Sequence, residues 1–294
     1  MSIEYTKNPR HSTDSALRKV FSAFFAFLLT LTLFLLTVVL VFRFRIISQD
    51  AFLSMIDEDY AKYTLEAIQE DAEYYVAPTG IDKSVLDGVF TTEEVLSDVR
   101  AHIAASLAGK EFEYVPNTKL AEERLENNVR AFLEENDLEP EDGTIDELVT
   151  HFSSDIMEIY THEATLPAMS LLTQVHKFSM KYTVVAIAVL VVLAVLFIVT
   201  CIKLHHYRHR GLRYVAYSFG GVGLMSLVIP GWLYFSKFYT GLNLQPHYFY
   251  HFVVTMVVRL LTSIMAAGVL WIGLTIILAV VVLIRRKMLM NPER

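Results

Sequence analysis

The stretch that decides the fold of this chain is "VFSAFFAFLLTLTLFLLTVVLVF", residues Val20–Phe42, which contains no charged residue. Lys19 precedes it and Arg43 follows it. A helix of about 20 apolar residues is long enough to cross the hydrocarbon core of a bilayer. The run is too long for the apolar part of a cleaved signal peptide, and no cleavage site of small residues follows it. It therefore predicts a retained membrane helix.

Three further apolar runs of this kind lie in the second half of the chain. Together with the first they predict four transmembrane helices, at residues 20–42, 181–203, 214–236 and 259–284. The 294 residues are 54% hydrophobic, with a mean hydropathy of +0.41, as is typical of a membrane protein. A backbone exposed to lipid must satisfy its own hydrogen bonds, and apart from a closed barrel only a helix does so. We therefore predict an all-α protein.

Charge is distributed unevenly along the chain. Residues 48–178 contain 29 acidic and 8 basic residues, so this segment has a net charge of −21, whereas the remainder carries +14. Such asymmetry indicates different surroundings for the two parts. The single cysteine, Cys201, excludes both an internal disulfide and a cysteine-based metal cluster.

The distribution of lysine and arginine predicts the orientation, because cytoplasmic loops are enriched in these residues. Basic residues gather in 1–19, 204–213 and 285–294, so the N-terminus, the short loop and the C-terminal tail are predicted to be cytoplasmic. Residues 43–180 then form an acidic extracytoplasmic domain, and 237–258 form an outer aromatic loop and membrane interface.

Several side chains are expected at the membrane surfaces. Arg259 precedes Arg285 by 26 residues, about 39 Å of helix, whereas the hydrocarbon core is about 30 Å thick. Arg259 is therefore expected to reach the outer headgroups rather than to serve as a functional charge within the membrane. The predicted membrane-interface residues are Arg213, Trp232, Lys237, Arg259, Arg285, Arg286 and Lys287.

The acidic segment is predicted to be a helical bundle inserted between the first two spans. Apolar residues recur at steps of three and four through Phe52, Ile56, Tyr60, Tyr63 and Ala67, as if the first helix continued out of the membrane. Pro78 and Gly80 are expected to break that helix. The next helices have their own start and stop signals.

These signals are short and local. Asp82 is a candidate cap for "KSVLDGVF", and Gly109 is expected to close the helix that starts at Thr91. Capping boxes are predicted for two pairs, Thr91 with Glu94 and Thr144 with Glu147. Pro167 suits the first turn of a last helix that runs into the second span.

The segment "APTGIDKSVLDGVFTTEEV", with Asp98 further along, resembles uncharacterised four-span membrane proteins of Gram-positive, clostridia-like bacteria. The resemblance rests on Pro78, Gly80, Asp82 and Val85, and more loosely on the four-span layout. It implies a bacterial envelope protein with a helical extracytoplasmic domain. It implies no catalytic residue.

One polar stripe in the acidic segment has metal-ligand chemistry. His151, Asp155, Glu158 and His162 are spaced four, three and four residues apart, on one helix face, and such side chains bind zinc. The two histidines are 11 residues apart, about 16 Å along a helix, so one ion cannot bind both. A solvated helix face accounts for the stripe better, and we predict no metal and no cofactor.

Three other clusters of residues each have a structural explanation as well as a functional one. In "KLHHYRHRGLRY", Lys203–Tyr214, three histidines could touch a metal, but the basic residues suffice to hold the loop in the cytoplasm. The aromatic segment around Trp232, Tyr239 and Tyr248 could be a docking platform, but a belt at the membrane surface is favoured. Glycines in "SFGGVGLMS" allow helices to approach closely, and a gating hinge is the alternative.

No P-loop, nucleophile elbow or zinc-protease motif occurs in the chain. We therefore predict a non-enzymatic, multi-pass protein of the bacterial cell membrane, with both termini cytoplasmic. Its outer helical domain is expected to bind a partner protein or an envelope ligand. Besides the lipid bilayer and a protein partner, the chain could form homo- or hetero-oligomers, and no nucleic acid is expected. The alternative is a permease-type subunit with MacB/FtsX-like topology that works with a separate ATPase.

Overall fold

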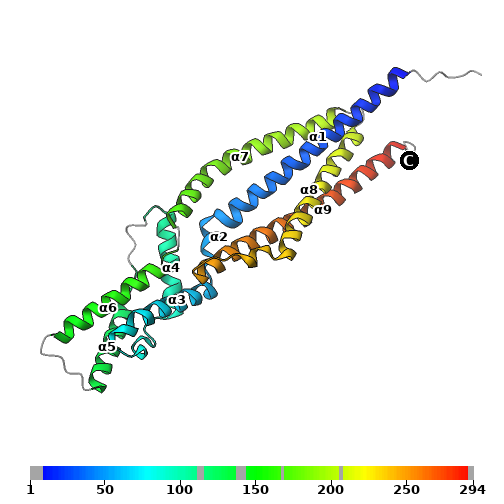
Figure 1. Cartoon of the computed structure of the whole chain (residues 1–294). Helices are drawn as coiled ribbons and strands as arrows, with labels where there is room; N and C mark the ends of the chain where they lie inside the picture. The colour runs from blue at the N-terminus through cyan, green and yellow to red at the C-terminus, as the bar shows by residue number, and fades with distance from the viewer. Residues whose placement is uncertain (1–8, 111–115, 137–143, 167–168, 205–207, 291–294) are drawn as a thin grey trace, which may run out of the picture. The chain divides into compact units, whose positions relative to one another are not determined.

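The computed structural model describes residues 9–110, 116–136, 144–166, 169–204 and 208–290, and within these ranges the chain is helical, with no strand (Figure 1). The α-helices are α1 (Pro9–Phe42), α2 (Gln49–Leu53), α3 (Glu58–Val76), α4 (Thr92–Leu107), α5 (Lys119–Glu135), α6 (Thr144–Glu163), α7 (Met169–Lys203), α8 (Arg208–Ser236) and α9 (His247–Met290). A π-helical turn, η1 (Arg43–Ile47), and three 3-10 turns, η2 (Ala77–Thr79), η3 (Lys83–Leu86) and η5 (Phe238–Gly241), complete them.

The chain divides into two compact units. The first, here the apolar unit, comprises 1–46, 180–238 and 258–294, and the second, here the polar unit, comprises Ile47–Ser179 and Tyr239–Val257. Four helical stretches are long and apolar enough to cross a membrane, namely Arg18–Ile47, Leu171–Lys203, Arg210–Gly241 and His247–Ile284. Within the described residues the all-helical prediction is confirmed, and four helices have the length and composition that the predicted spans require.

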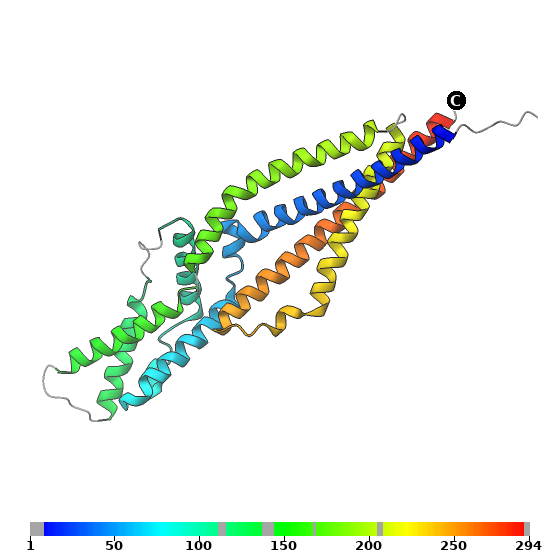
Figure 2. The ribbon, with the colours of Figure 1, turned by 45° about the horizontal axis from the view of Figure 1, so that its top comes forward.

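Small residues lie where α8 packs against α1 and α9 in the apolar unit, and Figure 2 shows these helices in yellow, blue and orange to red. A Cβ added at Gly221 of α8 would lie 2.9 Å from a methyl group of Thr30 in α1, and one at Gly223 would lie 2.6 Å from Ile272 in α9. Ser218 of α8 also donates a 2.8 Å hydrogen bond to the carbonyl of Ala26 in α1. The glycines therefore permit close helix packing, as the sequence predicted.

The expectation that the first helix continues into the polar unit is wrong. The chain leaves α1 through the π-helical turn, and α2 begins after Ser48, whose hydroxyl accepts a hydrogen bond from the backbone of Ala51. A further cap, Asp57, starts α3 by accepting the backbone N–H of Tyr60 at 2.9 Å. Each cap accepts a hydrogen bond from a backbone N–H group that the first turn of a helix leaves without a partner. The chain is therefore broken twice where one long helix was expected.

The other local signals are confirmed. Asp82 caps η3 by accepting the N–H of Ser84, and Gly80 ends η2 with a left-handed φ of 81°. Thr91 and Glu94 form the capping box at the start of α4. Gly109, with a φ of 79°, follows the end of α4, where a residue with a side chain would be strained.

One continuous apolar core fills the polar unit. The inward stripes of α4 and α5 include Val95, Val99 and Ile103 on one helix and Leu125 and Val129 on the other, all fully buried. Helices α3 and α6 pack against this core through their own apolar faces. Arg100 of α4 ties it to the turn before α3 by donating two hydrogen bonds to the carbonyl of Ile56, at 3.0 and 2.7 Å.

Residues Tyr239–Val257 belong to the polar unit, and some of their aromatic side chains pack into its core. Tyr248 and Phe252 are only 2% and 1% exposed and lie in the same apolar core. The Tyr248 ring meets Tyr60 at 5.6 Å between centroids, and the Phe252 ring meets Phe52 at 5.1 Å. The sequence missed this because an aromatic run of this kind fits a helical core as well as a membrane surface.

Some predicted features lie outside the described residues or concern side chains that are not described. They are Pro167, the histidines His205, His206 and His209, the Thr144 member of the second capping box, and the basic residues Arg285, Arg286 and Lys287. Of the other predicted interface residues, Trp232 is 70% exposed, and Arg213 lies in α8. Arg259 lies in α9, and Lys237 follows α8 with a φ of 50°.

Candidate functional site

A pocket with a volume of about 1030 Å³ lies within the polar unit. Its walls come from three parts of the chain: the middle of α3, the last two residues of α6, and the segment Thr240–Tyr250. The lining residues are Tyr63, Glu66, Ala67, Glu70, Asp71, His162, Glu163, Thr240, Leu242, Asn243, Leu244, Gln245, Pro246, His247, Tyr248 and Tyr250. They include four carboxylates and several aromatic rings, and neither lysine nor arginine.

Helix α3 supplies three of the carboxylates because of its periodicity. Tyr63, Glu66 and Glu70 follow one another at steps of three and four, so they share a face of the helix. Ile68 and Ala72 lie on the opposite face and are fully buried in the core. The same helix therefore fixes the core with one face and directs acidic side chains to the pocket with the other.

The fourth carboxylate, Glu163, is the most unusual group in the pocket. It is the last residue of α6 and is only 8% exposed. A buried carboxylate is costly unless hydrogen bonds compensate it, and the negative end of a helix dipole adds to the cost. Two partners provide compensation: Tyr248 donates its hydroxyl at 3.1 Å, and Nδ1 of the neighbouring His162 lies 2.9 Å away.

The surroundings of Asp71 in the pocket disfavour its ionisation. Burial raises the pKa of Asp71, and the negative charges of Glu163 and Glu70 raise it further. Burial likewise raises the pKa of the Tyr60 phenol, which remains neutral. The pocket therefore holds more negative charge than its own groups balance, and a bound cation would lower its electrostatic energy.

The pocket is equipped for binding a cation. Exposed carboxylates on α3 can form ion pairs with an ammonium or guanidinium group. Tyr63 and Tyr250 are half-buried and line the same pocket, and the faces of such rings attract cations. The side chain of His162 is 83% exposed beside Glu163, so it can meet a ligand directly.

The four residues of the predicted polar stripe do not come together. His151 and Asp155 line one pocket of about 530 Å³, while Asp155, Glu158 and His162 line another of about 400 Å³. Asp155 accepts a hydrogen bond from Tyr75 of α3. Among the described residues, none of the four belongs to a group of three potential metal ligands close enough to share an ion. Only His162 reaches the large pocket.

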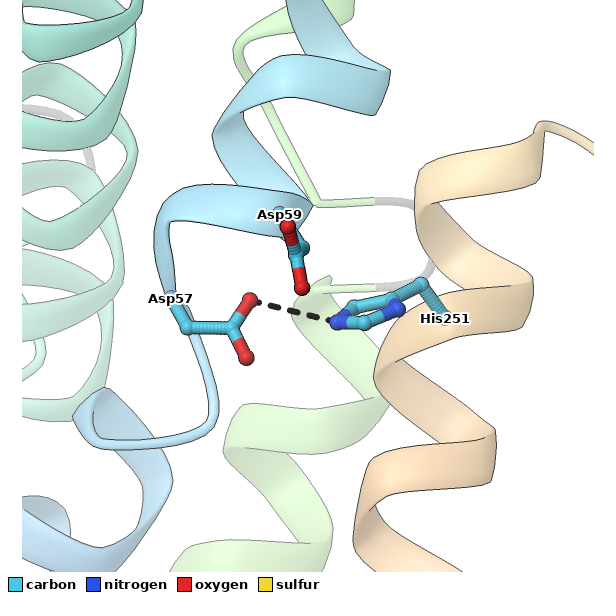
Figure 3. Close-up of side chains that lie close together, drawn as sticks. All are labelled: Asp57, Asp59 and His251. Carbon is cyan, nitrogen blue, oxygen red and sulfur yellow. Dashed lines mark hydrogen bonds and ion pairs between the residues drawn. The ribbon is translucent and has the colours of Figure 1, made fainter.

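The sequence missed most of the site. Glu66 and Glu70 have helical spacing, but this spacing is common on solvated helices. The pairing of Glu163 with Tyr248 joins residues 85 positions apart and leaves no local signal. A group that could hold a metal was also missed: Asp57 and Asp59 at the start of α3 lie beside His251 of α9 (Figure 3).

Comparisons of this chain with protein-family profiles, with curated protein sequences and with solved structures each found no match.

Proposed function

We propose that this chain is a non-enzymatic protein of the bacterial cell membrane whose polar unit lies outside the cytoplasm and binds a cationic ligand. One observation carries the proposal: the described residues that line the large pocket of the polar unit include four carboxylates and no lysine or arginine. Opposite charge attracts a cationic ligand and holds it, and a pocket of one sign concentrates the field.

The carboxylates and tyrosine rings of the pocket favour a ligand that carries a protonated amine or a guanidinium group. Either could form charge-assisted hydrogen bonds with Glu66, Glu70 and Asp71 and lie against the tyrosine rings. At about 1030 Å³ the pocket is at the upper end of the range for small ligands, roughly 300–1,000 Å³. The group can belong to a free polyamine or to a lysine or arginine side chain of a partner protein.

The orientation rests on the basic residues near the membrane, which favour cytoplasmic termini. Labelling of single cysteines in intact cells tests it, on a background in which the native cysteine is replaced, Cys201→Ala. A membrane-impermeant thiol reagent should label Glu158→Cys, an exposed position of α6, and should leave Arg210→Cys, exposed in α8, unlabelled until the cells are opened. The reverse labelling pattern would refute the orientation.

Binding is tested on the full chain in lipid nanodiscs by calorimetric titration. Two probes distinguish the sources of the cation: spermidine represents a free polyamine, and an oligolysine peptide represents a protein segment. The variant Glu66→Gln/Glu70→Gln/Asp71→Asn should weaken binding of the preferred probe about tenfold or more, since it removes three ion pairs of up to about 1 kcal/mol each.

A matched control separates the pocket from the general acidity of the unit. Glu123, Glu134 and Glu135 are exposed residues of α5 outside the pocket. Replacing these three by glutamine removes the same charge and should change affinity less than twofold if the pocket binds the probe. Equal weakening in both triple variants, or no binding of either probe, would contradict the proposal.

A further inference from the structure

Two carboxylates and a histidine meet in the polar unit where α3 begins. Asp57 is the N-cap of α3, Asp59 is in its first turn, and His251 is in the part of α9 that belongs to this unit. One ligand atom from each residue lies within 4.8 Å of the other two. Figure 3 shows the three side chains directed toward one another, with the imidazole facing both carboxylates.

The surrounding structure positions two of these groups. Oδ1 of Asp57 accepts the backbone N–H of Tyr60 at 2.9 Å, which fixes the carboxylate as the helix cap. The ring of His251 lies against Tyr63, with 5.4 Å between centroids, and its Nε2 is 3.2 Å from Oδ1 of Asp57. Asp59 is exposed, so its carboxylate is free to rotate toward the other two.

The local charge is poorly balanced by the protein. Asp57, Glu58 and Asp59 are three consecutive acidic residues, and the first turn of a helix tolerates such residues because of its dipole. No described lysine or arginine forms an ion pair with Asp57 or Asp59. His251 is the basic group that faces both, and a neutral imidazole would leave the two negative charges uncompensated.

We propose that Asp57, Asp59 and His251 form a binding site for a divalent transition-metal ion such as Zn²⁺. One imidazole nitrogen and two carboxylate oxygens are zinc ligands, with bonds of about 2.0–2.2 Å. Two ligands of a tetrahedral ion at these distances are about 3.3–3.4 Å apart, close to the 3.2 Å between Nε2 of His251 and Oδ1 of Asp57. Three protein ligands leave the fourth position for water. The nitrogen ligand favours a transition metal over Ca²⁺, which takes oxygen ligands.

The ion takes the place of the proton between His251 and Asp57. Without metal, Nε2 carries a proton that it donates to the carboxylate, and with metal the Nε2 lone pair binds the ion. In a neutral imidazole the remaining ring proton then lies on Nδ1. The bound ion joins residues 194 positions apart, and it stabilises the packing of α9 on α3 by mass action.

The site is tested on full-length protein with a non-histidine affinity tag, stripped by a chelator and titrated with Zn²⁺ alone. We expect a site with a stoichiometry near one and a rise in melting temperature with Zn²⁺. Asp59→Ala removes an exposed ligand without disturbing the core, and His251→Ala removes the nitrogen ligand. Each should weaken binding at least about tenfold, the lower end of the loss seen when only supporting groups are removed.

Two neighbours serve as controls. Glu58→Ala removes an exposed carboxylate from the same turn, and His247→Ala removes a histidine one turn away on α9 that also packs on Tyr63. Both should retain the affinity of the parent chain within about threefold. Zinc affinity that is equal in Asp59→Ala, His251→Ala and the parent chain, or a stoichiometry near zero, would overturn the proposal.

Discussion

The hydroxyl of Tyr248 donates a hydrogen bond to the buried carboxylate of Glu163 at 3.1 Å, joining two helices through residues 85 positions apart. Removing this donor leaves Glu163 with His162 as its described partner. We predict that Tyr248→Phe lowers the free energy of unfolding by about 1–3 kcal/mol, the cost of leaving a buried acceptor unsatisfied. Denaturant unfolding in detergent micelles, followed by circular dichroism, measures the loss.

Tyr250→Phe is the matched control for that change. The hydroxyl of Tyr250 donates to the carbonyl of Thr240 at 3.4 Å in an exposed position. Its removal should alter the free energy of unfolding by no more than about 0.5 kcal/mol. If the two variants lose the same stability, the Tyr248 hydroxyl has no special role.

Local signals predicted the starts and ends of helices in the polar unit well, because each signal acts over three or four residues. The caps Asp82 and Thr91 bond the backbone two and three positions ahead, so both partners stand together in the sequence. The sequence did not predict the break between α1 and α3, for a related reason. Phe52, Ile56 and Tyr60 are all buried, and their spacing imitates one continuous helix even though Ser48 and Asp57 restart it.

The site could not be predicted in this way, because its partners are distant in sequence. Glu163 accepts a hydrogen bond from Tyr248, and Asp57 pairs with His251. Tyr248 and His251 both follow the third apolar helix in the sequence. The pattern of the aromatic segment was ambiguous between a membrane surface and a core. Only the tertiary contact of Tyr248 with Tyr60 resolves it.

The capping box of α4 should make stability depend on acid pH. Burial of Glu94 opposes its ionisation, but hydrogen bonds from Arg124 and Thr91 outweigh this and lower its pKa. A carboxyl whose folded pKa is depressed contributes stability above its unfolded pKa, and this stability is lost as the pH falls through the folded pKa. We predict that Glu94→Gln costs about 1 kcal/mol near neutral pH and flattens the decline of the melting temperature in acid.

Glu93 tests whether the effect belongs to the box. It is exposed in the same turn of α4, so Glu93→Gln removes an equal charge near the same helix terminus. Melting temperatures of both variants between neutral and strongly acidic pH should differ, with Glu93→Gln following the parent curve. Parallel curves for Glu94→Gln and the parent would show that the pairing with Arg124 adds no stability.

Close packing between α8 and α9 should make Gly223 intolerant of a side chain. An added Cβ would lie 2.6 Å from Cδ1 of Ile272, which can move, and 3.2 Å from the carbonyl oxygen of Gly268, which cannot move alone. We predict that Gly223→Val destabilises the apolar unit by about 1–3 kcal/mol. Unfolding in rising fractions of dodecyl sulfate, followed by Trp271 fluorescence, measures it.

Gly273 of α9 is the control, because an added Cβ there meets nothing within 4 Å. Gly273→Val introduces the same side chain into the same kind of helix and should leave stability within about 0.5 kcal/mol of the parent. Equal losses at both positions would mean that the cost comes from valine in a helix and not from the contact with Ile272 and Gly268.

The ionisation of Asp71 couples cation binding to pH. Its raised pKa means that ionisation costs more in the folded chain, so this carboxyl weakens folding as the pH rises from its unfolded pKa through the folded one. Asp71→Asn should therefore raise the melting temperature of the free protein at neutral pH. It should also weaken binding of a cationic probe up to about fivefold, since exposed ion pairs contribute about 1 kcal/mol or less.

A bound cation should return the pKa of Asp71 toward its ordinary value and so release protons in the acid range where the carboxyl is partly protonated. Titrations of spermidine in two buffers with different ionisation enthalpies measure this release. The parent chain should show it at acid pH and lose it near neutrality, where Asp71 is already ionised. A release of the same size in Asp71→Asn would assign the protons to another group of the pocket and would remove Asp71 from the binding site.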